Sequence, residues 1–192
     1  MSMEILPEAG RVGEIYAHLF ENAEAGVERD IFWSITCPCA PIQYGGEEWT
    51  TSITCEWLAW TLSDWTGLNG AGYESVKRPD LVECSFYLFE HHPVALQALT
   101  LHAIPETDRF VVCIKGETDI GGFGELDGRY AFAAECEVEF QGLVVVPGNL
   151  YPKPRSGQEA AATLAPFIKL ANFQEPEWDR FRYVFCLRSR ET

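Results

Sequence analysis

Cationic side chains are scarce in this sequence, and one long stretch has none. The chain contains 14 Lys and Arg residues against 29 Asp and Glu residues, which gives a formal net charge of -15. No Lys or Arg occurs between Arg29 and Lys77. Such an acidic protein repels nucleic acid backbones and anionic lipids, so we expect neither as a partner and expect a basic protein partner instead.

Long apolar runs are also missing. Nowhere do 18 uncharged apolar residues follow one another, and the opening residues MSMEILPEAG lack the basic and apolar regions of a secretory signal. Both absences disfavour membrane insertion and export. The seven cysteines are scattered, mostly beside apolar or β-branched neighbours, a pattern typical of buried, reduced thiols rather than of a disulfide framework. We therefore expect a cytoplasmic protein.

The remaining composition is that of an ordinary globular protein. Hydrophobic residues make up 47% and charged residues 22% of the 192 positions. A chain of this length buries most of its apolar surface without the help of a metal or disulfides. We expect a single globular domain over residues 1–192 with an aromatic-rich core.

Periodicity predicts two or three helices. Apolar residues at three- and four-residue spacing between Pro7 and Gly26 favour a helix over residues 8–25. Residues 50–65 fit two structures, because the residues TTSIT favour a strand and the residues that follow favour a helix. We favour a helix from about residue 53 that ends at Gly67, with its tryptophans on one stripe that Asp64 continues. Ser156 and Glu159 form a capping box that starts a third helix toward residue 172, and Pro166 should kink or split it.

Strands are predicted from alternation and from aromatic and β-branched residues. The clearest case is residues 129–140, where apolar and polar residues alternate strictly after a turn at Asp127-Gly128. Further strands are predicted over residues 30–37, 83–90, 109–115, 142–146 and 181–187, and residues 93–101 fit either a strand or a helix. This order indicates an α+β fold, a mainly antiparallel sheet with two or three helices packed on one face.

The base-free stretch is also rich in tryptophan, which makes it the main candidate for a partner-binding surface. Carboxylates without nearby cations produce a negative field, and tryptophans provide large rigid contact areas. Trp33 lies on a predicted strand and is expected in the core. The candidate partner-binding residues of this segment are Glu47, Glu48, Trp49, Glu56, Trp57, Trp60 and Asp64.

A second candidate surface lies on the alternating strand. Glu135, Glu137 and Glu139 share one face of it and repel one another unless a cationic strand lies beside them. The predicted last strand places Arg180, Arg182, Arg188 and Arg190 on one side. Either these arginines neutralise the glutamates, or the glutamates form an acidic ridge for a basic partner.

No motif for a catalytic, cofactor or metal site is complete. Cys37 and Cys39 are spaced too closely for a usual zinc ligand pair and have no companion pair. His91 and His92 are typical of solvent-facing residues at a strand boundary. The glycines of residues 121–124 lie among carboxylates that would repel phosphate, and they match neither a P-loop nor a dinucleotide fingerprint. We therefore predict no cofactor, no metal and no catalytic residue.

Two alternatives remain open. A small hydrolase could use Cys84 or Cys113 with a histidine, or paired carboxylates such as Glu47, Glu48 and Glu56 beside Trp49, which are features of sugar-cleaving clefts. The second alternative is an oligomeric structural protein whose tryptophan stripe packs against another copy of the chain.

In its acidity, its small size and its lack of an active-site motif, the whole chain resembles the immunity proteins of bacterial toxin and immunity pairs. The resemblance implies a non-catalytic, cytosolic protein that neutralises a basic toxin domain in a one-to-one complex. Opposite charge would then assist association.

Overall fold

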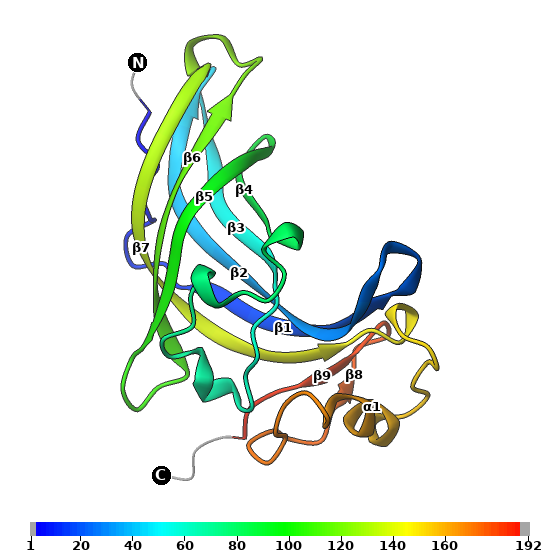
Figure 1. Ribbon diagram of the computed structural model, residues 1–192. Helices are drawn as coiled ribbons and strands as arrows, with labels where there is room; N and C mark the ends of the chain where they lie inside the picture. Colours follow the sequence, from blue (N-terminus) through cyan, green and yellow to red (C-terminus); the bar gives the residue numbers. More distant parts are fainter. Residues whose placement is uncertain (1–2, 189–192) are drawn as a thin grey trace.

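The fold is mostly antiparallel β-sheet (Figure 1). The computed structural model describes residues 3–188. The strands are β1 Gly13–Asn22, β2 Val27–Tyr44, β3 Glu47–Leu58, β4 Glu83–Leu88, β5 Glu90–Ala103, β6 Arg109–Ile120, β7 Gly128–Val145, β8 Glu177–Trp178 and β9 Tyr183–Phe185. One α-helix, α1 Gly157–Leu164, and several short 3-10 turns complete the described elements.

The first seven strands form a closed ring. Each strand from β1 to β7 pairs antiparallel with the next, and β1 also pairs in parallel with the second half of β7. Antiparallel hairpins need only short connections, which explains how one chain can wind round the ring in sequence order. Beyond residue 142, β7 takes β9 as its outer neighbour, and β8 extends the sheet from β9.

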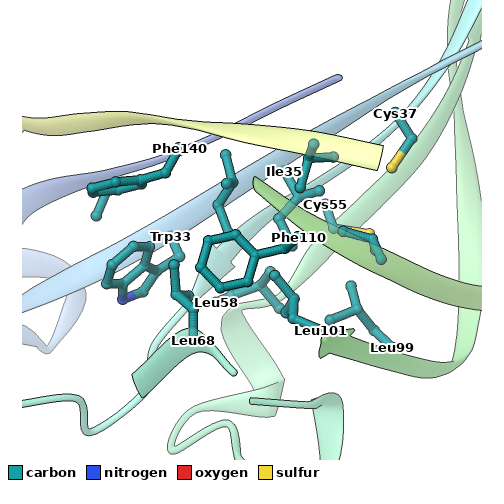
Figure 2. Packing of buried hydrophobic residues seen from close by; sticks show 14 of the residues in the cluster. Trp33, Ile35, Cys37, Cys55, Leu58, Leu68, Leu99, Leu101, Phe110 and Phe140 are labelled. Atoms are coloured by element: carbon teal, nitrogen blue, oxygen red, sulfur yellow. The ribbon is translucent and has the colours of Figure 1, made fainter. Parts of the chain in front are cut away.

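Strand alternation fills the ring with apolar side chains. On β2, for example, Ile31, Trp33 and Ile35 point inward and are at most 4% exposed. Figure 2 shows Trp33, Phe110 and Phe140 packed together with Leu58 and Leu68, which come from β3 and from the segment that follows it. The predicted core position of Trp33 is therefore confirmed.

The connection between β3 and β4, residues 59–82, closes one end of the ring. Its backbone bridges β5 through Gly72 and Thr100, and its Trp65 ring lies parallel to Phe140 of β7 with centroids 5.4 Å apart. Trp60 lies 6.4 Å from Trp33 of β2. Because these contacts reach three strands round the ring, the connection spans the opening.

The predicted α+β fold is wrong, and both early helices are absent. Residues 13–22 form β1, since Ile15, Ala17 and Leu19 alternate with a period of two and the closed sheet buries this face, although Ile15 and Leu19 also fit the helical spacing. Residues 47–58 form β3, so the expected tryptophan stripe does not exist. Tertiary pairing here outweighs the local helix preference of the sequence.

Other element predictions are confirmed. The alternating strand lies within β7, the segments at 30–37 and 109–115 lie within β2 and β6, and the undecided residues 93–101 belong to β5. The Ser156 hydroxyl accepts a hydrogen bond from the Glu159 amide, as the capping box predicts. The predicted continuation of this helix toward residue 172 is wrong, since α1 already ends at Leu164, before Pro166. Within residues 3–188 no helix has the length and apolar character needed to cross a membrane.

Candidate functional site

Three hairpin ends meet at the end of the ring opposite the β3 to β4 connection. They are the turns between β2 and β3, between β4 and β5, and between β6 and β7 (Figure 1). Each turn carries aromatic side chains, and these join into one cluster. We call the cluster and the carboxylates around it the hairpin-tip surface, which consists of Tyr44, Glu47, Glu48, Trp49, Phe89, Glu90, Phe123 and Glu125.

Phe89 is the centre of the aromatic cluster. Its ring centroid lies 4.4 Å from that of Trp49, 5.6 Å from that of Tyr44 and 4.9 Å from that of Phe123, on which it stacks. Phe89 occupies the tight turn between β4 and β5 with a left-handed backbone (φ 61°), an uncommon conformation for a bulky residue. Its side chain thereby joins three hairpins that are far apart in the sequence.

The carboxylates of the hairpin-tip surface have no cationic neighbours of their own. Residues 40–50, 86–94 and 116–128 contain no Lys or Arg. Within residues 3–188, Glu47, Glu90 and Glu125 form no ion pair, and Glu48 accepts a hydrogen bond from the Gln43 amide at 2.8 Å. The surface therefore combines exposed negative charge with Trp49, which is 36% exposed.

The structure separates the other predicted residues from this surface. Trp49 and Trp57 are eight positions apart along β3, a distance of about 25 Å of strand. Opposite Ser34 of β2, Glu56 and Trp57 form a β-bulge, and Trp57 has a φ of 61°. The bulge reverses the alternation, so Leu58 points into the ring and Trp57 packs outside it against Phe20 and Phe32.

Trp60 and Asp64 have structural roles. The Trp60 indole is 3% exposed and donates a hydrogen bond to the Gly72 carbonyl oxygen at 2.9 Å. Asp64 caps the 3-10 turn Trp65–Leu68 by accepting a hydrogen bond from the Thr66 amide. Trp60 is therefore not available to a partner, and the half-buried Asp64 lies apart from the hairpin-tip surface.

Two of the three glutamates of β7, Glu137 and Glu139, are paired with β6 and not with the last strand. Arg109 donates to Glu137 at 2.8 Å and to Glu139 at 3.1 Å, and Glu135 lies opposite Cys113. The arginines near the end of the chain lie elsewhere, because β9 pairs with residues 143–145: Arg182 binds Asp179, Arg188 donates to the Phe173 carbonyl, and Arg190 lies outside the described residues. The acidic ridge is therefore largely internally paired.

One histidine, His18, lies in the aromatic cluster outside the ring. Its ring contacts those of Phe32 and Trp57, with centroids 6.1 and 5.2 Å apart. Burial lowers the pKa of His18 from 6.5 to about 4, because the apolar surroundings disfavour the charged form. Beside this cluster a pocket of about 240 Å³ is lined by Phe20, Trp57 and the carboxylate residues Asp80 and Glu83, among others.

In the part of the chain that the structure describes, the residues considered for catalysis do not come together in a catalytic site. His91 bonds Ser85 at 2.9 Å on the outer surface, and buried His92 bonds the Leu88 carbonyl. Cys84 contacts another thiol rather than a histidine. No group of three or more His, Cys, Asp or Glu side chains within residues 3–188 is arranged to hold a metal ion.

Sequence reasoning missed a large groove in the described part of the chain. A groove of about 1510 Å³ lies between the segment before α1 and β8, with walls that include Tyr151, Lys153, Arg155 and Trp178. Tyr151 is 86% and Trp178 is 52% exposed. Within residues 3–188 neither cationic side chain of this groove forms an ion pair, and the one carboxylate in its walls, that of Glu159, accepts a hydrogen bond from the Arg155 backbone amide, so the groove presents a net positive charge on an otherwise acidic protein.

Comparison with known proteins gives no relative: no family model, no curated protein and no solved structure matches the chain significantly.

Proposed function

We propose that the chain is a non-catalytic binding protein that holds a basic protein partner on its hairpin-tip surface. The observation that carries the proposal is the joining of three distant hairpins through Phe89 into an aromatic cluster surrounded by unpaired carboxylates. Aromatic side chains supply much of the affinity of protein interfaces, and complementary charge speeds association. In its most specific form, the partner is a toxin domain and the chain is its immunity protein.

The test begins with partners captured from the native cell on the immobilised chain and identified by mass spectrometry. The purified partner is then titrated against the wild type and against a variant carrying Glu47→Gln, Glu48→Gln and Glu90→Gln. We expect the affinity to fall at least about tenfold in this variant, because the lost charges face the partner.

A control variant removes two carboxylates at the opposite end of the ring, where the turns after β1 and β5 lie. Glu24→Gln and Glu106→Gln also remove exposed negative charge, but away from the hairpin-tip surface. The control variant should bind nearly as tightly as the wild type. An equal loss of affinity in both variants would show that only net charge matters. An unchanged affinity in both would show that the partner does not bind at the hairpin-tip surface.

Co-expression tests the more specific form of the proposal. If the chain is an immunity protein, co-expression of a captured toxin with the wild type should restore growth.

The groove before α1 favours a second candidate function, the binding of an acidic peptide. Lys153 and Arg155 supply unpaired positive charge, and Tyr151 and Trp178 supply exposed rings at its walls. A short oligo-glutamate peptide should quench or shift the fluorescence of the wild type. The response should disappear with Trp178→Phe, and affinity should fall with Lys153→Gln and Arg155→Gln but not with Lys115→Gln and Arg129→Gln. An undiminished response in the groove variants would exclude this function.

A further inference from the structure

Two cysteines face each other inside the ring. Cys55 of β3 and Cys84 of β4 are directly opposite in the antiparallel pairing, and their sulfur atoms are 2.6 Å apart. The two residues are 1% and 8% exposed. They lie 29 positions apart in the sequence, so only the pairing of the two strands brings them together.

Other thiols also have polar neighbours. Cys39 and Cys136 make hydrogen bonds to carbonyl oxygens, at 3.6 and 3.4 Å, and Cys136 also interacts with the Cys37 thiol. The separation of Cys55 and Cys84 is much closer to a sulfur–sulfur bond of about 2.05 Å. Directly opposed residues of antiparallel strands have Cα atoms about 4.5 or 5.5 Å apart, and both values lie within the range that a disulfide bridges.

We infer that Cys55 and Cys84 are a disulfide-forming pair that covalently joins β3 to β4. The oxidant is a second disulfide, such as oxidised glutathione. One cysteine thiolate attacks this disulfide and releases a thiol, and the other thiolate attacks the mixed disulfide and releases the second thiol. Two electrons and two protons thus pass from the cysteines to the oxidant, which becomes two thiols.

The surroundings determine when this exchange occurs. The contact with Cys84 and burial both raise the pKa of the Cys55 thiol, so little thiolate forms in the closed ring. Exchange is therefore fast while β3 and β4 are still exposed and slow once the protein has folded. The bond closes a loop that contains residues 59–82, the connection that covers one end of the ring, and so restrains this connection as well.

The experiment uses the full chain. The protein is unfolded, refolded in a mixture of oxidised and reduced glutathione, treated with an alkylating reagent in denaturant, and analysed by intact mass and by peptide mapping without reduction. We expect two fewer alkylated thiols than in fully reduced protein and a linked peptide pair containing Cys55 and Cys84. The Tm of the oxidised protein should exceed that of the reduced protein by about 5–10 °C.

Two variants separate this pair from its neighbours. Cys37→Ser with Cys136→Ser should retain the linked peptides and the rise in Tm, and Cys84→Ser should lose both. The peptide map of the wild type decides the question even if Cys84→Ser does not fold. Recovery of alkylated Cys55 and Cys84 from the oxidised sample, or linkage of either to a different cysteine, would overturn the inference.

Discussion

At the scale of single residues, the tryptophans of the base-free stretch have different structural roles. Trp33 and Trp60 are core residues, and Trp57 packs against the outside of the ring because a β-bulge turns it there. Trp49 alone joins the hairpin-tip surface, where its indole donates to the Tyr44 carbonyl at 3.3 Å and its ring contacts Phe89. The proposed binding function therefore depends on Trp49 more than on any other tryptophan.

The first prediction concerns Trp49→Ala. We expect this substitution to weaken binding of the captured partner at least about tenfold, since exposed aromatic residues at the centre of an interface contribute much of its affinity. The measurement is isothermal titration calorimetry against the purified partner. Trp178→Ala removes a similarly exposed indole from a different surface and should leave the affinity within a factor of about two. A partner that tolerates Trp49→Ala but not Trp178→Ala would place the interface at the groove.

The second prediction concerns His18 and pH. Its pKa is about 4 in the folded protein and near 6.5 when unfolded, so the unfolded state binds the proton more strongly. The stability associated with neutral His18 is present above pH 6.5 and is lost as the pH falls toward 4, a change of about 3 kcal/mol. Urea unfolding of wild type and His18→Phe between these pH values should show a smaller loss in the variant. Identical pH dependence in both proteins would contradict the buried, neutral state of His18.

At the scale of elements, β7 is the strand on which the fold depends most. It pairs with β6 through Glu139, with β1 from Val138 onward, and with β9 beyond Gly142. Gly142 lies at the irregularity where the register with β1 shifts. Its φ of +115° is unfavourable for any residue with a side chain, and a Cβ there would overlap the Phe185 carbonyl oxygen of β9.

The third prediction is that Gly142→Ala destabilises the protein by about 2–4 kcal/mol, through backbone strain and the displacement of β9. Urea unfolding gives the stability, and the exposure of Trp178 on the neighbouring β8 is followed by fluorescence quenching with acrylamide. Gly148→Ala is the matched control, because no atom lies within 4 Å of its added Cβ and its φ is not in the left-handed region. A change below 1 kcal/mol at Gly142 would show that β7 and β9 can separate at little cost.

The elements also show what the sequence could predict. The strict alternation of residues 130–140 identified the inward face of β7, and the Ser156 capping box identified the start of α1, because both signals are local. The segment of β1 carries both a helical and an alternating pattern, and only its pairing with β2 and β7 selects the strand. Bulges such as that at Trp57 move a side chain to the other face without a signal in the local sequence.

At the scale of the whole molecule, closure of the ring brings together the residues of the hairpin-tip surface. The sequence identified Glu47, Glu48 and Trp49 because of their unusual local composition, but Phe89 and Phe123 belong to hairpins far along the chain and join them only in three dimensions. The same closure brings together Cys55 and Cys84.

Charge is unevenly distributed along the chain. Residues 1–146 contain 24 acidic and 7 basic residues, whereas residues 147–192 contain 5 acidic and 7 basic residues.

The last prediction follows from this charge. At low ionic strength the carboxylates of the ring repel one another and destabilise the compact state, and salt screens this repulsion. Raising NaCl from about 10 mM to about 150 mM shortens the Debye length from about 30 Å to about 8 Å, so the Tm should increase by a few degrees.

Salt should affect binding in the opposite direction. The same screening weakens the attraction between the hairpin-tip surface and a basic partner, so the association rate should fall over the same range in which the Tm rises. Thermal unfolding by circular dichroism and stopped-flow binding at matched salt concentrations test both effects. The variant with Glu47→Gln, Glu48→Gln and Glu90→Gln should show a smaller salt dependence of association, whereas Glu24→Gln with Glu106→Gln should keep most of it. An association rate of the wild type that does not change with salt would show that the negative charge of the chain does not contribute to binding.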